Sequence, residues 1–147
     1  MPTRNPNLSK WYILAVDDDP PSLALVQDML ARYKAKVYTA TSGTDALALL
    51  RAMPRPTVIL CDVVMPLVDG FALLDTLRAN KAIQSVPIIA VTALAMSGER
   101  EQILAAGFDG YISKPFSVLT FVHDLIACSV KHKRLMGDNG SMILEEL

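Results

Sequence analysis

The chain has 147 residues, about the length of one domain. Hydrophobic residues make up 52% of it and charged residues 20%, so the composition supplies a sizeable core and excludes a disordered chain. Lys and Arg together number 14 against 15 for Asp and Glu, a net charge of −1. This balance lacks the basic excess of a nucleic-acid-binding or membrane-binding surface, so we expect neither kind of partner.

Neither the cysteines nor the apolar segments point to secretion or to a membrane. Cys61 and Cys128 form no CxxC pair and no disulfide framework. No apolar run reaches the roughly 18 residues of a membrane span, and residues 1–10 lack the apolar region of a signal peptide. We therefore predict a cytoplasmic protein with a flexible N-terminal segment at residues 1–10.

The first half of the chain alternates between strand and helix patterns. Trp11–Val16 is a continuous apolar run that predicts a strand. Apolar residues then recur at helical spacing after Pro20 and Pro21, which are a helix start signal. Lys36–Ala40 predicts a shorter strand, and a second helical pattern ends before Pro54.

The second half of the chain continues this alternation. Three more strands are predicted at Thr57–Cys61, Val86–Val91 and Tyr111–Ser113. Helical patterns start near Phe71, Ser97 and Ser117. Because continuous apolar strands are typical of parallel sheets buried on both faces, the pattern predicts an α/β fold with a doubly wound parallel sheet.

Polar residues stand where four of these strands end. Asp17 and Asp18 follow the first strand, Asp62 the third, Thr92 the fourth and Lys114 the fifth. In open α/β sheets, ligands bind beyond the carboxyl ends of the strands. One such residue would be ordinary turn or cap chemistry, but five together predict a shared pocket.

The charges of this cluster indicate its chemistry. Three neighbouring carboxylates repel each other, and Lys114 alone cannot neutralise them. A hard divalent cation fits such a site, and Mg²⁺ suits one with few carboxylates and a phosphate. A carboxylate is already ionised at neutral pH, so it can attack a phosphoryl group without a general base. Lys114 and the Thr92 hydroxyl supply what the incoming phosphoryl group needs.

Four segments of the sequence, ILAVDDDP, LCDVVMPLVDG, IIAVTALA and GYISKPF, resemble the receiver domain of two-component response regulators. The order and spacing of the segments also fit that family. The resemblance runs over residues 11–133, which implies a receiver domain there and a flexible tail at 134–147. It implies a flavodoxin-like (βα)5 fold of five parallel strands in the order 2-1-3-4-5, in a bacterial phosphorelay protein.

The resemblance also implies a role for each residue of the pocket. Asp62 matches the phospho-acceptor. Asp18 matches the residue that ligates Mg²⁺ directly, Asp17 the one that usually acts through water, and the Val64 backbone carbonyl the remaining protein ligand. No other cofactor is implied.

The switch residues and partners follow from the same resemblance. Lys114 matches the lysine that pairs with a phosphoryl oxygen, Thr92 the switch hydroxyl, and Tyr111 the aromatic that turns inward with it. The donor would be a histidine kinase or a histidine phosphotransfer protein. A downstream protein or a second copy would bind the face of the fourth helix, fifth strand and fifth helix. The protein would catalyse only its own phosphorylation and dephosphorylation, and would not be an enzyme otherwise.

Two other functions stay open. A haloacid-dehalogenase-type phosphatase needs an Asp-x-Asp motif after a strand, which residues 17–19 contain, although Asp19 is predicted to cap the next helix. Against it, Pro21 replaces the expected Thr or Val, Val64 replaces the expected acid after Asp62, and no paired acidic motif follows Lys114. A docking module independent of phosphorylation usually lacks an acidic residue or the lysine, and here all are present.

Overall fold

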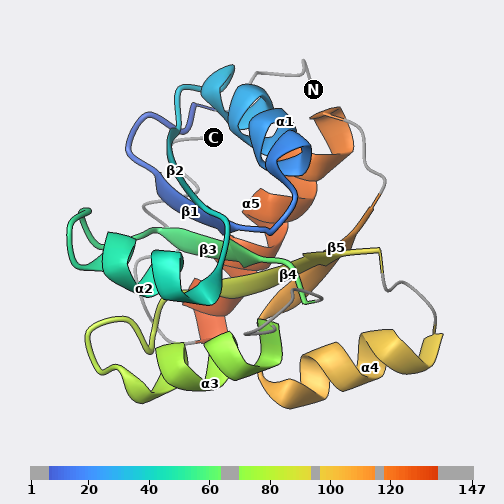
Figure 1. Cartoon of the computed structure of the whole chain (residues 1–147). Coiled ribbons are helices and arrows are strands. Elements are labelled where there is room, and N and C mark those ends of the chain that lie inside the picture. Colours follow the sequence, from blue (N-terminus) through green and yellow to red (C-terminus); the bar gives the residue numbers. More distant parts are fainter. Residues whose placement is uncertain (1–6, 64–69, 94–96, 115–117, 136–147) are drawn as a thin grey trace.

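A computed structural model describes residues 7–63, 70–93, 97–114 and 118–135 (Figure 1). Five strands and five helices alternate along the described chain, and the strands form one parallel sheet in the order β2-β1-β3-β4-β5. The elements are β1 Tyr12–Val16, α1 Pro20–Ala31, β2 Lys36–Ala40, α2 Gly43–Leu50, β3 Val58–Cys61, α3 Gly70–Ala79, β4 Ile88–Thr92, α4 Ser97–Ala106, β5 Gly110–Ser113 and α5 Val118–Leu135. The predicted fold class and strand order are confirmed.

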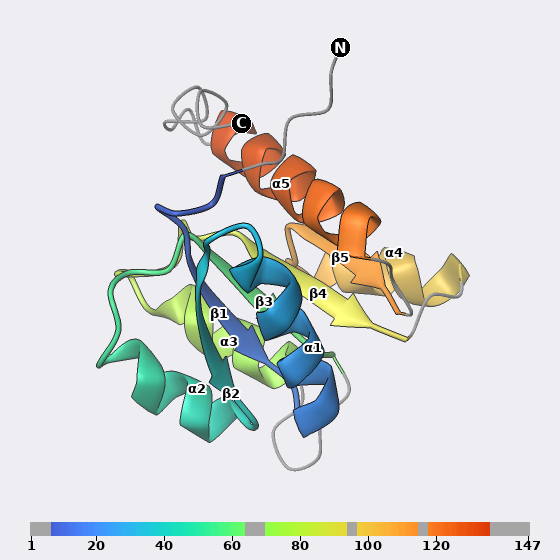
Figure 2. The same cartoon turned by 90° about the horizontal axis from the view of Figure 1, so that it is seen from above.

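Helices cover both faces of the sheet. Helices α1 and α5 lie on one face, and α2, α3 and α4 lie on the other (Figure 2). Alternate residues of each strand point to opposite faces, so β1 sends Ile13 and Ala15 into the first core cluster and Leu14 and Val16 into the second. This explains why the inner strands are almost entirely apolar, with the hydroxyl of Thr92 at the carboxyl end of β4 as a polar exception.

The strand register brings the polar strand ends to one level. Val16 pairs with Cys61, and the Asp62 backbone N–H donates to the Val16 carbonyl at 2.9 Å. Between β4 and β5, the Lys114 backbone N–H donates to the Thr92 carbonyl at 2.9 Å. The carboxyl ends of β1, β3, β4 and β5 therefore form one edge, as the sequence predicts.

Described residues lie beyond both ends of the predicted domain 11–133. Leu8 is fully buried, and its N–H donates to the Tyr33 carbonyl at 2.7 Å. Leu8, in the segment 1–10 that is predicted to be flexible, therefore packs into the α1/α5 cluster with Trp11. At the other end, α5 continues to Leu135, so residues 134 and 135 belong to the helix. Residues 136–147 of the predicted tail lie outside the described residues.

No helix of the described chain is long and apolar enough to cross a membrane.

Lys34, in the turn between α1 and β2, has a left-handed backbone with a φ of 73°. This conformation costs an L-residue roughly 1–2 kcal/mol, and glycine avoids the cost. We expect Lys34→Gly to raise the free energy of unfolding in urea by about 0.5–1 kcal/mol, after the larger chain entropy of unfolded glycine is subtracted. Ala31→Gly, at the helical end of α1, is the matched control and should lower stability by about 1 kcal/mol. Equal losses in both variants would contradict the prediction.

Candidate functional site

Three acidic side chains meet at the carboxyl edge of the sheet. Asp17 follows β1, and Asp62 follows β3, where their side chains are 10% and 12% exposed. One carboxylate oxygen from each of Asp17, Asp18 and Asp62 lies within 4.8 Å of the other two. The structure therefore brings together the three carboxylates that the sequence predicted to share a pocket.

Lys114 joins this cluster from the end of β5. Its ammonium Nζ lies 2.8 Å from Asp17 Oδ2 and 3.6 Å from Asp62 Oδ2. Burial is the largest influence on the pKa of Lys114 and acts to lower it, but the hydrogen bond and charge of Asp17 and the charge of Asp62 outweigh it and leave the pKa raised. Lys114 thus stays protonated at neutral pH and pairs with two of the three carboxylates, those of Asp17 and Asp62.

The turn after β1 aims Asp17 at the cluster. The Asp19 N–H donates to Asp17 Oδ1 at 2.9 Å, which fixes the carboxylate from the side away from Lys114. Asp19 holds the N-cap position of α1, as predicted, but its side chain makes no cap bond to the backbone. Instead, the Asp19 carboxylate accepts a hydrogen bond from the Ser22 hydroxyl at 2.6 Å. The prolines at the first two positions of the helix have no backbone N–H that could donate to Asp19.

Thr92 and Tyr111 lie on the two strands beside the cluster. Thr92 ends β4 and is only 1% exposed. Tyr111 is half-buried on β5 and packs against the core cluster on the α2/α3/α4 face. The guanidinium carbon of Arg100, on α4, lies 5.2 Å from the centroid of the Tyr111 ring. Arg100 is a neighbour that the sequence analysis did not identify.

Gly70, the first residue of α3, is a second residue missed by the sequence analysis. Its N–H donates to the Val63 carbonyl at 3.0 Å. A Cβ built on Gly70 would lie 2.7 Å from Val63 Cα and closer still to the carbonyl oxygen of Asp62. Only glycine lets α3 begin this close to the backbone of Asp62. The Asp69-Gly70 pair signals a helix start in the sequence but not this contact.

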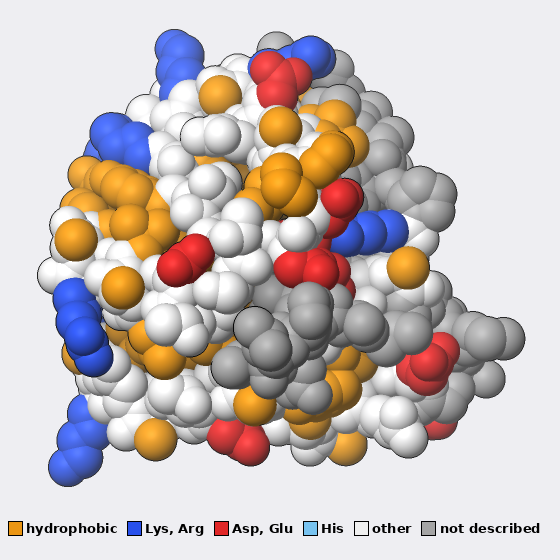
Figure 3. Space-filling view, viewed as in Figure 1, with side chains coloured by type: hydrophobic (Ala, Val, Ile, Leu, Met, Phe, Trp, Pro, Cys, Tyr) orange, Lys and Arg blue, Asp and Glu red, His pale blue; other side chains and the backbone are white. Residues whose placement is uncertain are grey.

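One predicted site residue cannot be placed, since Val64 lies outside the described residues. The remaining predicted residues, Asp17, Asp18, Asp62, Thr92, Tyr111 and Lys114, all lie at or beside this edge. Asp18 is exposed, so the cluster reaches the surface. Figure 3 shows acidic side chains gathered near the middle of one face of the molecule, beside a basic side chain.

Comparison with known proteins agrees with this arrangement. The family model of the response regulator receiver domain matches residues 13–125. The chain belongs to the response regulator receiver family. Response regulators of this family accept a phosphoryl group on an aspartate and switch partner binding, so the receiver function predicted from the sequence is confirmed. Because the match spans nearly the whole described sheet, the phosphatase alternative loses its support.

The chain is also similar in sequence and structure to individual response regulators. It is 34% identical over 113 residues to the polar-differentiation response regulator DivK of Brucella ovis, covering 77% of this chain and 91% of that protein. It is also similar to the chemotaxis response regulator CheY4 of Vibrio cholerae, at 30% identity and a TM-score of 0.74, covering 80% of this chain and 98% of that one. A receiver domain of a histidine kinase from Syntrophus aciditrophicus matches at 27% identity and a TM-score of 0.72, covering 84% and 93% of the two chains.

Proposed function

We propose that Asp62 is the phospho-acceptor of this receiver and that Lys114 and Thr92 assist the transfer. The observation that carries this proposal is the position of Asp62, whose carboxylate lies within 4.8 Å of two other carboxylates and 3.6 Å from the Lys114 ammonium. An Asp62 carboxylate oxygen forms a bond to phosphorus while the bond from phosphorus to the donor breaks. The acceptor needs no general base because its carboxylate is already ionised.

The donor set also fits a magnesium ion. Three carboxylates lie within 4.8 Å of one another, and among the described residues one ammonium, that of Lys114, pairs with two of them, which leaves uncompensated negative charge on oxygen ligands. Asp17, Asp18, Asp62 and the Val64 carbonyl would hold Mg²⁺, a cation that prefers oxygen ligands. Bound there, Mg²⁺ would supply positive charge for the phosphoryl oxygens.

The chain's own residues then orient and sense the phosphoryl group. Lys114 pairs with one phosphoryl oxygen, for which it leaves the carboxylates that it bridges in the structure. The Thr92 hydroxyl donates to another, which moves Thr92 toward Asp62. The protein turns over no external substrate, since the group it accepts stays on its own carboxylate until water removes it.

The partners follow from this chemistry. The donor is a phosphohistidine on a kinase or on a phosphotransfer protein, in the cytoplasm. The output is a downstream protein or a second copy that binds the face formed by α4, β5 and α5. Nucleic acid and membranes are not direct partners, because the chain as a whole carries no basic excess.

The direct test is phosphorylation by acetyl phosphate in Mg²⁺, followed by intact mass spectrometry. The wild type should gain one phosphoryl group and Asp62→Asn none. Asp75→Asn removes an exposed carboxylate of α3 and should be labelled like the wild type. Labelling of Asp62→Asn at the wild-type level would contradict the assignment of Asp62. No labelling of the wild type would favour a docking module independent of phosphorylation.

Repulsion among the carboxylates gives a prediction for stability. In chelator, Asp62→Asn should raise the melting temperature by a few degrees, the shift that about 1 kcal/mol produces in a domain of this size. Added Mg²⁺ binds only the folded state, so it should stabilise the wild type more than the variant. Thermal unfolding with and without Mg²⁺ measures both effects. Equal shifts on adding Mg²⁺ would mean that Asp62 is not a ligand.

A further inference from the structure

Helix α4 buries few of its described side chains. Among its described side chains, those of residues 99–106, only Ile103 is buried. Figures 1 and 2 show α4 at one side of the sheet, beside β5. Few buried apolar contacts mean a low cost of local displacement, so α4 is a helix that can shift without unfolding the domain.

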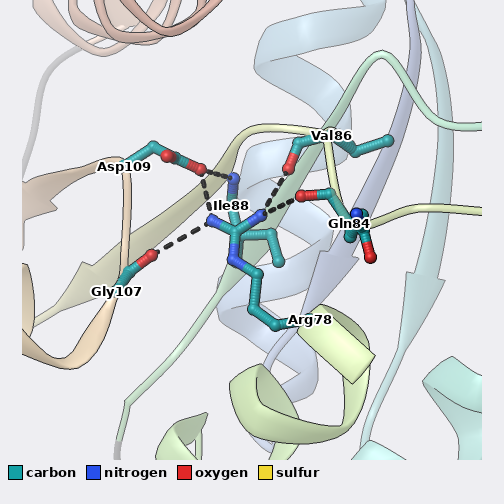
Figure 4. A network of polar contacts seen from close by, with 6 residues as sticks. All are labelled: Arg78, Gln84, Val86, Ile88, Gly107 and Asp109. Carbon is teal, nitrogen blue, oxygen red and sulfur yellow. Dashed lines mark hydrogen bonds and ion pairs between the residues drawn. The ribbon is translucent and has the colours of Figure 1, made fainter. Parts of the chain in front are cut away.

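The C-terminal end of α4 is fixed by Arg78 of α3 (Figure 4). The Arg78 guanidinium donates to the Gly107 carbonyl at 3.1 Å and to Asp109 Oδ2 at 2.6 Å. The same guanidinium donates to the carbonyls of Gln84 and Val86, both at 3.0 Å. This end of α4 is therefore tied to α3 and to the start of β4, at the sheet edge opposite the acidic cluster.

The first half of α4 reaches the sheet through Arg100. Its guanidinium carbon lies over the Tyr111 ring, 5.2 Å from the centroid. A cation in this position is attracted by the face of the ring, and the planar guanidinium also stacks on it. Since Arg100 is itself exposed and Tyr111 half-buried, the contact holds the ring beneath α4.

Tyr111 also lies within reach of Thr92. Tyr111 pairs with Ala90 in the sheet, and Thr92 pairs with Ser113. Ala90 and Thr92 are two residues apart on β4 and share a face, and Ala90 and Tyr111 pack in the α2/α3/α4 cluster. Tyr111 and Thr92 are thus diagonal neighbours on one face, a separation that an aromatic side chain spans. If Thr92 moves toward Asp62, space opens on the Thr92 side of the Tyr111 ring, and a turn of the ring toward that space would weaken its contact with Arg100.

We propose that Arg100 is a positioning residue that holds the Tyr111 ring against α4 and thereby opposes the phosphorylated state. The inference rests on the proposed role of Asp62 and adds to it a residue that sets how readily the switch responds. Arg100 weakens the response because its contact with Tyr111 must break before the ring moves. Arg78 keeps the far end of α4 in place, so the change is concentrated in the half of α4 that carries Arg100.

The test is the affinity for beryllofluoride, which mimics an acyl phosphate on an aspartate, measured by calorimetry in excess Mg²⁺. Arg100→Ala should bind beryllofluoride about two- to fivefold more tightly than the wild type, the range expected for an exposed cation–π contact. Arg100→Lys keeps the charge but loses the planar stacking, so its affinity should be intermediate. Gln102→Ala, an exposed change on the same helix, should bind like the wild type.

The same substitution made in a Tyr111→Leu variant separates an effect of Arg100 on the Tyr111 ring from a general effect on α4. In Tyr111→Leu, adding Arg100→Ala should leave the affinity unchanged, because the ring that Arg100 contacts is absent. Without beryllofluoride, the NMR signals of the Tyr111 ring, assigned with the help of Tyr111→Phe, should shift in Arg100→Ala. Unchanged or weaker binding in Arg100→Ala, or the same gain in the Tyr111→Leu background, would overturn the inference. If the wild type binds no beryllofluoride, the proposed function fails together with it.

Discussion

Gly70→Ala should lower the free energy of unfolding by about 3 kcal/mol, the upper end of the usual cost of overpacking. The added Cβ would lie 2.7 Å from Val63 Cα and would also meet the Asp62 carbonyl oxygen. Both atoms belong to the backbone, so no side-chain rotation relieves the clash. Either α3 or the end of β3 must shift.

The same variant should also lose most of its capacity for phosphorylation. Because the clash involves Asp62 and Val63, it displaces the backbone that carries the proposed acceptor. A displacement of about 1 Å at a reacting group can cost about 100-fold in rate. We therefore expect the rate of labelling by acetyl phosphate, measured at a temperature where the variant is folded, to fall by about that factor.

Ala79→Gly is the matched control for Gly70→Ala. It lies at the exposed C-terminal end of α3 and should cost about 1 kcal/mol through helix propensity. Its labelling rate should stay at the wild-type value, since the backbone of Asp62 is untouched. A Gly70→Ala protein with wild-type stability and labelling would show that α3 does not depend on this close approach.

Arg78→Leu should lower the free energy of unfolding by about 2–4 kcal/mol. Breaking a fully buried ion pair usually costs about 3–5 kcal/mol, and the 26% and 18% exposure of Arg78 and Asp109 reduces this through solvent screening. The variant leaves Asp109 with the Ile88 N–H, at 2.8 Å, but without the cation. The carbonyls of Gln84, Val86 and Gly107 also lose a donor (Figure 4).

Two further variants test the geometry of this network. Arg78→Lys keeps the charge but cannot reach all four oxygens at once, so its loss of stability should be intermediate. Arg55→Leu removes an exposed arginine that binds the Ala82 carbonyl and the Ser85 hydroxyl in the same α3–β4 connection. Because Arg55 has no ion pair there, we expect a loss below about 1 kcal/mol. Similar urea midpoints for Arg55→Leu and Arg78→Leu would contradict the larger contribution to stability that we assign to the Arg78–Asp109 ion pair.

The fold was predictable because its signals are local. Apolar runs such as Thr57–Cys61 mark strands buried on both faces, and the polar residue that ends each run marks the edge where the strands finish. The acidic cluster followed from these two signals, since parallel strands bring their carboxyl ends together. The roles within it came from the resemblance of four segments to receiver domains, and the Asp62–Lys114 ion pair agrees with them.

The features that could not be predicted depend on contacts between distant segments. Arg78 binds Asp109, 31 residues along the chain, and neither residue stands out in the sequence. Leu8 lies in a segment with no strand or helix pattern, and only the packing of α1 and α5 shows that it is buried. The need for glycine at position 70 appears only when α3 is placed against β3.

The burial of Trp11 determines which optical signals this receiver offers. Trp11 is the chain's single tryptophan, is 2% exposed, and precedes β1 at the end of the strand opposite Asp17. It packs in the α1/α5 layer, whereas Thr92, Tyr111 and α4 belong to the other face. Intrinsic fluorescence will therefore follow global unfolding well and will respond little to events at Asp62. A fluorescent reporter of the switch has to be introduced on the α4 side of the sheet.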